Sequence, residues 1–317
     1  MNHDRIEALL ERIALALEQM VAQANQHRTP NVAYSQSHSD TEKTSLEPSS
    51  RNSNASSLSI LEPFLKARGI QIKVRPAEDA ADQVIDSLSL FLGERYDALA
   101  GLLGKIKRAM QTGAQITESL KDRPQQDISS ACQFCTRLYE VAFLEQYQYF
   151  RSPTYLIKAK TTTLPKAQRF FGGQWLERFI LQKVKAVYAQ VSSEVSEQLA
   201  FEYLINPQII LPNGDDFELD ILAAMGSSIY WIEAKSGDYQ QHVAKYSKFA
   251  RLLGLDPDHS FMVLADVPED RCEALSALFS MTVCTLRSFE EKLLTVVRSD
   301  TAQQSAAADG FSSTAGR

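Results

Sequence analysis

Two acidic residues and one lysine are spaced so that a β-hairpin would bring them together. The run from Phe217 to Lys235 contains Asp220 and ends in the triplet Glu233-Ala-Lys235. Side chains alternate along a strand, so Glu233 and Lys235 are expected on the same face. If the chain turns at residues 225–228, Asp220 falls beside the end of the strand that carries them. The spacing therefore predicts that two carboxylates and one amine converge.

Such a cluster is unfavourable on apolar strands unless its charges are paired or bound to a metal ion. Carboxylate oxygens are hard ligands that suit Mg²⁺ or Mn²⁺, so Asp220 and Glu233 are candidate ligands. Lys235 would then orient a metal-activated water or neutralise charge that develops on a phosphate. These residue types predict the hydrolysis of phosphodiester bonds.

The same residues resemble the signature of the PD-(D/E)XK nuclease superfamily, in which an Asp precedes a Glu-x-Lys triplet. Here Asp220 is followed by twelve residues and then by Glu233-Ala-Lys235. Upstream, the run Gly172-Gly-Gln-Trp-Leu-Glu177 resembles the first-helix motif of the nuclease domain in CRISPR ancillary nucleases activated by cyclic oligoadenylate. The resemblance spans residues 168–298 and implies that Glu177 is a third acid at the metal site.

The strand that carries Asp220 departs from the related motif at one position. That motif reads Asn-Glu-apolar-Asp, whereas here Phe217 stands in place of the Asn. The match favours Asp220 over Asp215 or Asp216 as the metal ligand. The resemblance thus implies a catalytic set of Asp220, Glu233, Lys235 and Glu177, with Asp220, Glu233 and Glu177 binding Mg²⁺ or Mn²⁺.

The elements that must position these side chains can be read from composition and periodicity. A strand is predicted at 155–163, and the following segments read in the order αβββαβαβα. Hairpin-linked strands followed by strand–helix alternation predict a mixed β-sheet with helices on both faces. The fold class is therefore α/β, and the resemblance implies a restriction-endonuclease-like αβββαβ core. Helices are predicted at 174–190, 239–253, 269–279 and 288–298, and strands at 199–211, 217–224, 229–235, 260–265 and 282–286.

Five segments are predicted along the chain. A narrow apolar stripe indicates an amphipathic helix in residues 1–26. Nine serines and few apolar residues between His27 and Ser57 predict a disordered linker at 27–57. The remaining segments are a mostly helical domain at 58–150, a nuclease-like domain at 151–298 and a disordered tail at 299–317.

The region 58–150 is predicted to be helical because its apolar residues recur with a period near 3.6 up to Thr112-Gly113. A further helix is predicted from Cys132 to Phe150, and it makes Cys132 and Cys135 buried structural thiols rather than a metal or redox pair. The pattern lacks the strand–helix repeats of a Rossmann-like nucleotide sensor. Activation by cyclic oligoadenylate is therefore not carried over from the related nucleases.

The formal net charge of −6 excludes a polycation that binds nucleic acid through bulk charge, so any such contact must be local. The stretch 158–185 holds seven basic residues and one acid, and a second basic group begins at Lys245. A solvated surface is the alternative interpretation of such runs. The candidate nucleic-acid-binding residues are Lys158, Lys160, Arg169, Lys245 and Lys248.

The leading interpretation is a metal-dependent endonuclease that acts in anti-phage defence or in repair. DNA is the favoured substrate and RNA is the alternative. The alternative is a catalytically inactive nuclease-fold scaffold or nucleic-acid-binding protein. A homodimer is compatible with the first helix, because cutting both strands needs two sites. Four scattered cysteines, no signal-like N-terminus and no long apolar run predict a cytoplasmic protein without membrane contact.

Overall fold

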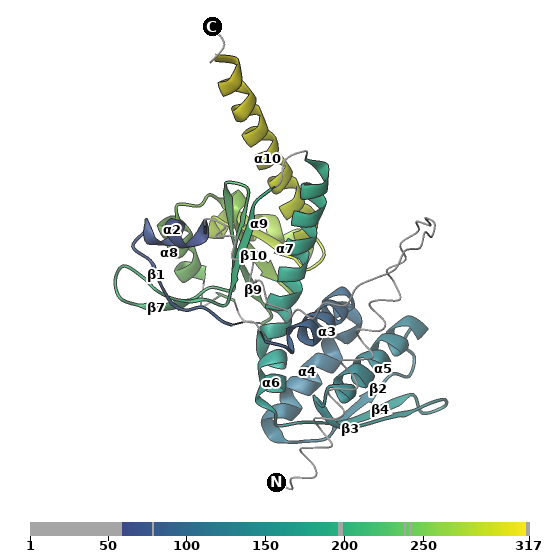
Figure 1. Ribbon diagram of the computed structural model, residues 1–317. Coiled ribbons are helices and arrows are strands. Elements are labelled where there is room, and N and C mark those ends of the chain that lie inside the picture. Colours follow the sequence, from purple (N-terminus) through teal and green to yellow (C-terminus); the bar gives the residue numbers. More distant parts are fainter. Residues whose placement is uncertain (1–58, 78, 196–198, 238, 241–242, 315–317) are drawn as a thin grey trace, which may run out of the picture. The chain divides into compact units, whose positions relative to one another are not determined.

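A five-stranded mixed sheet carries Glu233 and Lys235 (Figure 1). In the computed structural model its strands lie in the order β11-β10-β9-β8-β5. The β5–β8 and β8–β9 pairs are antiparallel, whereas β10 is parallel to both β9 and β11. The predicted α/β class with a mixed sheet is confirmed. The strands are β5 (Phe201–Ile205), β8 (Ile221–Met225), β9 (Ser228–Lys235), β10 (Ser260–Leu264) and β11 (Thr282–Thr285).

The structure describes residues 59–77, 79–195, 199–237, 239–240 and 243–314, with side chains as far as Ala306. The residues from Ser59 onward belong to one compact unit. The predicted helix at 1–26 and the predicted linker at 27–57 lie outside the described residues.

The hairpin of β8 and β9 is closed by a two-residue turn. Its register pairs Ile221 with Ile232 and Met225 with Ser228. Gly226 has φ 62°, a backbone conformation that glycine adopts without steric penalty. This register sets Asp220, which directly precedes β8, beside the end of β9.

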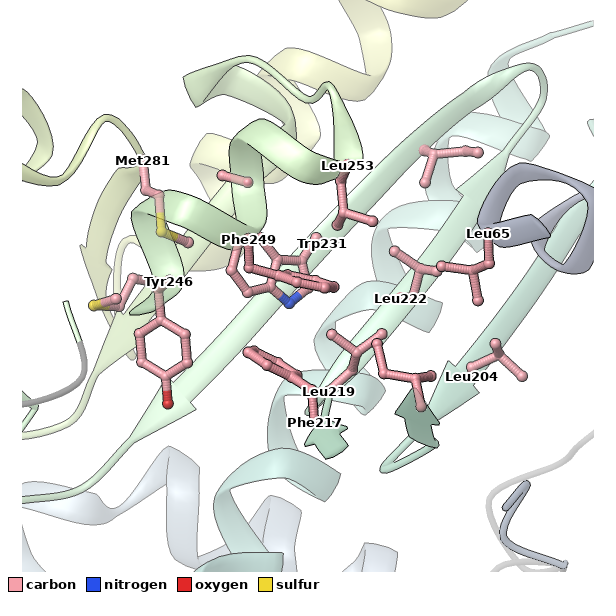
Figure 2. Close-up of a cluster of buried hydrophobic side chains, with 14 of the residues drawn as sticks. Leu65, Leu204, Phe217, Leu219, Leu222, Trp231, Tyr246, Phe249, Leu253 and Met281 are labelled. Carbon is pink, nitrogen blue, oxygen red and sulfur yellow. The ribbon is translucent and has the colours of Figure 1, made fainter. Parts of the chain in front are cut away.

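Each face of the sheet is covered by helices. On the face that includes Trp231, the core is closed by α2 (Leu61–Lys66), α8 (Val243–Leu253) and α9 (Cys272–Phe279). Figure 2 shows Trp231 beside Phe249 of α8, and the two rings meet edge to face at 4.9 Å between centroids. The opposite face packs against α7 (Trp175–Glu194) and α10 (Phe289–Thr314).

A second group of elements precedes this sheet in the chain. Helices α3 (Asp82–Glu94), α4 (Tyr96–Thr112) and α5 (Gln125–Glu140) accompany an antiparallel sheet of β2 (Ile116–Ser119), β4 (Leu156–Thr161) and β3 (Leu144–Phe150), in that order. The helices predicted here from the apolar period are confirmed by α3 and α4, most of whose apolar side chains are buried, and Gly113 caps the end of α4 with φ 70°. Helix α6 (Pro165–Arg169) and a π-helical turn, η1 (Phe170–Gln174), then lead into α7.

The predicted helix from Cys132 to Phe150 is wrong in its second half. Helix α5 ends at Glu140, and residues 144–150 form β3, where exposed and half-buried side chains alternate as in a one-sided strand. The predicted domain boundary at 150/151 falls inside the β3–β4 hairpin. Cys132 and Cys135 are free thiols on α5, and Cys135 is fully buried.

Two predicted strands are each divided in two. The segment 199–211 gives β5 and β6 (Gln208–Ile210), and the segment 217–224 gives β7 (Asp216–Glu218) and β8. The short strands β6 and β7 leave the main sheet and form a second sheet with β1 (Gln71–Val74), in which β6 lies between β1 and β7. At each division the chain therefore passes from one sheet to the other.

The predicted disordered tail at 299–317 is helical as far as Thr314, because α10 does not stop near residue 298. Two hydrogen bonds hold this part of α10 against the β8–β9 hairpin. The hydroxyl of Tyr230 donates to Asp300, and Gln304 Nε2 donates to Ser228 Oγ over 3.1 Å. Among the helices in the described ranges, none is long and apolar enough to cross a membrane.

Candidate active site

Lys235 lies between two buried carboxylates. Its Nζ is 2.7 Å from Asp220 Oδ2 and 3.1 Å from Glu233 Oε2. Asp220 is 6% exposed and Glu233 is 1% exposed, while a quarter of the Lys235 side chain, 25%, reaches solvent. The three side chains lie together, as the hairpin register requires.

The backbone of the hairpin fixes the two acids relative to each other. The amide of Ala234 donates to Asp220 Oδ2 over 2.8 Å, and the amide of Asp220 donates to Glu233 Oε1 over 3.3 Å. Asp220 lies in the break between β7 and β8, so its amide is free of the sheet ladder and available to Glu233. The break in the predicted strand is therefore part of the site.

Glu177 belongs to the same site and is held by Asn206. Glu177 stands in the first turn of α7, and its Oε2 accepts a hydrogen bond of 2.6 Å from Asn206 Nδ2. The backbone amide of Asn206 donates to the carbonyl of Asp220 over 2.9 Å. One residue thus joins the helix that carries Glu177 to the loop that carries Asp220.

Asn206 was not among the site residues predicted from the sequence. The pair Asn206-Pro207 signals a turn, and the residue does adopt φ 49°, which Asn tolerates better than most side chains. The turn could have been predicted. Its contact with Glu177, 29 positions away along the chain, has no local sequence signal.

Burial and like charge shape the protonation of the site. Burial, together with the charge of Asp220, raises the pKa of Glu177 to about 7. The same two causes raise the pKa of Glu233. Burial alone would lower the pKa of Lys235, but the charges of Glu233 and Asp220 outweigh it and the pKa rises. Lys235 therefore stays protonated and faces more acidic groups than it can neutralise.

The donor set fits a divalent cation in type and charge. Asp220, Glu233 and Glu177 offer hard oxygen ligands, and their combined charge exceeds that of Lys235. The hydrogen bonds to Asp220 and Glu177 within the described ranges use Oδ2 and Oε2, which leaves Oδ1 and Oε1 without a donor there. No three acidic, histidine or cysteine side chains of the described residues are close enough to hold an ion as they stand. Binding would require these carboxylates to turn towards a common point.

The hydrophobic core also holds the site. Trp231 is fully buried, and its Nε1 donates to Glu233 Oε1 over 3.2 Å. The ring of Tyr246 from α8 lies 5.6 Å from Lys235 Nζ. The aromatic layer of Figure 2 therefore supplies both a donor to one site residue and a ring beside another.

The predicted nucleic-acid-binding lysines and arginine are not part of this cluster. Lys158 and Lys160 lie on β4 of the other sheet, where Lys160 pairs with Glu145 at 2.8 Å. Arg169 ends α6, and Lys245 and Lys248 lie on α8, with Lys245 Nζ 4.1 Å from the ring centre of Phe217.

Several charges of the basic stretch 158–185 are neutralised within the fold. Lys166 pairs with Asp79, Lys183 pairs with Glu290, and Arg178 pairs with acids of α3. The Arg178 side chain is only 13% exposed. Much of this stretch therefore joins elements together rather than offering free positive charge.

Two solved structures are similar to this chain. The protein VC1899 from Vibrio cholerae matches with a TM-score of 0.49 and 16% identity, over 75% of this chain and 60% of its own. Can2 from Sulfobacillus thermosulfidooxidans, determined in complex with cyclic tetra-adenylate, matches with a TM-score of 0.47 and 13% identity, over 75% of this chain and 59% of its own. The chain thus spans about three-fifths of the length of each. No family model and no curated protein matches the sequence.

Proposed function

We propose that this protein is a metal-dependent nuclease that hydrolyses phosphodiester bonds, with DNA as the first substrate to test and RNA as the second. The observation that carries the proposal is the convergence of Asp220 and Glu233 on Lys235, with Glu177 held nearby through Asn206. The sequence motifs that resemble those of PD-(D/E)XK nucleases contain these same four residues, Asp220, Glu233, Lys235 and Glu177.

Each residue has a role that follows from its surroundings. Asp220, Glu233 and Glu177 would hold Mg²⁺ or Mn²⁺, which when bound activates water and polarises the phosphate. Lys235 keeps its proton, because its pKa is raised, so it is a donor and not a general base. Its ammonium group would donate to a phosphate oxygen and stabilise the negative charge that grows there.

The test is cleavage of plasmid and single-stranded DNA by the full chain with Mg²⁺ or Mn²⁺, and its arrest by EDTA. Lys235→Met should abolish cleavage and retain the fold by circular dichroism. Lys66→Met, which removes a charge from an exposed position on α2, is the matched control and should cut normally. Cleavage that persists in EDTA or in Lys235→Met would contradict the proposal.

One observation favours a second candidate, an inactive nuclease-fold protein that binds nucleic acid. Lys235 Nζ already holds Asp220 and Glu233 together, in the place between the acids where an ion would compete. In that case the protein would bind DNA or RNA and cut neither with any metal. Binding without cleavage in the same assay would select this candidate.

A cytoplasmic homodimer is the assembly that we propose for a nuclease that cuts both strands, because one site cuts one strand. The measurement is the mass of the full chain in solution. A monomer that linearises plasmid in a single binding event would contradict the dimer and leave the chemistry intact.

A further inference from the structure

Helix α4 contributes a lysine beside the candidate active site. Lys107 Nζ donates to Ser236 Oγ over 3.3 Å, and Ser236 directly follows Lys235. The side chain lines a cavity of about 430 Å³ between α4 and the turn that leads into α7. The other residues of this cavity are Met110, Gln111, Gln168, Phe171 and Gly172.

The charge of Lys107 is not matched within the fold. It is half-buried, and no carboxylate in the described part of the chain lies within ion-pair distance of its Nζ. Burial lowers the pKa of Lys107, and the more distant charge of Asp266 opposes that effect. Lys105 on the same helix instead pairs with buried Glu118. A half-buried ammonium group with only a hydroxyl partner is suited to an incoming anion.

Helix α4 is fixed relative to the site at its other end. The ring of Tyr96 stacks on Trp175 with 5.4 Å between ring centres, and its hydroxyl donates to Asp266 Oδ1 over 2.7 Å. Trp175 begins the helix that carries Glu177, and Asp266 follows β10. Lys107 is therefore held by the same elements that position the acids.

The mouth of the cavity is open on the side of η1. A Cβ atom added to Gly172 would meet no atom within 4 Å. Gln111 and Gln168 add amide groups that can donate to phosphate oxygens. The lining thus combines one cation, two amides and an unobstructed backbone.

We propose that Lys107 binds a backbone phosphate of the nucleic acid next to the phosphate that is cut. The inference rests on the proposed nuclease function and adds to it a substrate contact from outside the nuclease motifs. Lys107 holds the strand, while Lys235 acts on the reacting phosphate. A phosphate contact of this kind is independent of base sequence.

The test measures binding of a fluorescein-labelled single-stranded oligonucleotide to the full chain by anisotropy, in EDTA, over a series of salt concentrations. Lys107→Gln should weaken binding about tenfold at low salt. It should also reduce the slope of log affinity against log salt by about 0.7, the value for one phosphate contact on a single strand. Lys107→Arg should keep the slope.

Two control variants separate a phosphate contact from other effects. Arg108→Gln removes a charge from an exposed neighbour on α4, and Ser236→Ala removes the hydrogen bond but keeps the ammonium group. Both should keep the wild-type slope. An unchanged slope in Lys107→Gln, an equal fall in either control, or no binding by the wild type would overturn the inference. A slope change without cleavage under any metal would instead overturn the nuclease function and leave the phosphate contact standing.

Discussion

At the scale of single residues, the site is a balance of buried charges that one lysine holds together. Asp220 and Glu233 are both buried, and Lys235 is the cation that pairs with each of them. Buried ion pairs contribute modestly while intact, but removing one partner leaves uncompensated charge behind. Lys235 is therefore expected to matter for stability as well as for chemistry.

Lys235→Met should lower the free energy of unfolding by about 3 kcal/mol, because it strands two carboxylates in the protein interior. Urea unfolding followed by fluorescence measures the loss. Adding Glu233→Gln to Lys235→Met should restore part of it, since one of the stranded charges is then gone. A Lys235→Met protein as stable as the wild type would show that the acids take up protons when the lysine is lost and so leave no buried charge behind.

Asn206 should act as a positioning residue for Glu177. Asn206→Gly removes the amide but tolerates φ 49° without strain. If the nuclease function holds, the loss of this partner should raise the Mn²⁺ concentration for half-maximal cleavage about tenfold or more. Asn213→Gly, at an exposed turn between β6 and β7, is the matched control and should leave it unchanged. If both variants needed the same Mn²⁺ concentration for half-maximal cleavage, Asn206 would have no role in positioning Glu177.

At the scale of elements, α3 and α7 pack together at Gly93 with no room for a side chain. A Cβ atom at this position would overlap the ring of Phe179, which is 2% exposed and cannot move aside. Overlap in a packed core destabilises by about 1–3 kcal/mol, which outweighs the gain of about 1 kcal/mol in helix propensity.

Gly93→Ala should therefore lower the melting temperature, and Gly101→Ala should raise it. A Cβ atom at Gly101 of α4 meets no atom within 4 Å, so only the propensity gain of about 1 kcal/mol remains there. Thermal unfolding of the two variants gives the comparison. A stabilised Gly93→Ala protein would mean that α3 and α7 can separate at no cost.

His259 should make the packing of α10 on the sheet depend on pH. Its ring nitrogens lie 2.7 Å from Asp256 Oδ1 and 3.0 Å from Asp300 Oδ2, and Tyr230 both stacks on the ring and donates to Asp300. Burial alone would lower the pKa of His259, but the two carboxylates raise it above 6.5. The protonated form is thus favoured by folding.

The sign of the pH effect follows from that shift. The contribution of His259 is fully present below pH 6.5 and is lost as the pH rises through the raised pKa of the folded protein. Unfolding free energies of wild type and His259→Gln, measured on both sides of that pKa, should converge at the higher pH. A difference that grows with pH would contradict the assignment.

The sequence predicted the elements whose pattern is local and missed those that depend on distant contacts. The alternation in Glu233-Ala-Lys235 and the turn near Gly226 were enough to place three side chains together. The contact between Asn206 and Glu177 could not be predicted, because no periodicity marks a pair of residues so far apart. Residues 144–150 were assigned to a helix as the continuation of the apolar pattern that begins at Phe134 and reaches Leu144, whereas pairing with β4 makes them a strand.

At the scale of the whole described chain, the helical region and the five-stranded sheet are joined by polar and aromatic contacts. Arg178 of α7 pairs with Asp82 and Asp86 of α3, and Tyr96 of α4 contacts both Trp175 and Asp266. The β3–β4 hairpin then leads directly into α6, η1 and α7. This continuity is consistent with one compact unit from Ser59 onward.

Residues 59–317 should consequently unfold in one cooperative transition. The two tryptophans report on different places, since Trp175 contacts α4 and Trp231 lies in the core of the five-stranded sheet. Tyr96→Phe removes the hydrogen bond to Asp266 and should lower the free energy of unfolding by about 1 kcal/mol. The unfolding curves from tryptophan fluorescence and far-ultraviolet circular dichroism should shift together, because neither region melts alone.

Tyr203→Phe is the control, because the Tyr203 hydroxyl has no hydrogen-bond partner among the described residues, and it should leave both unfolding curves in place. Two separated transitions, with Tyr96→Phe moving only one, would show instead that the helical region and the sheet are independent domains.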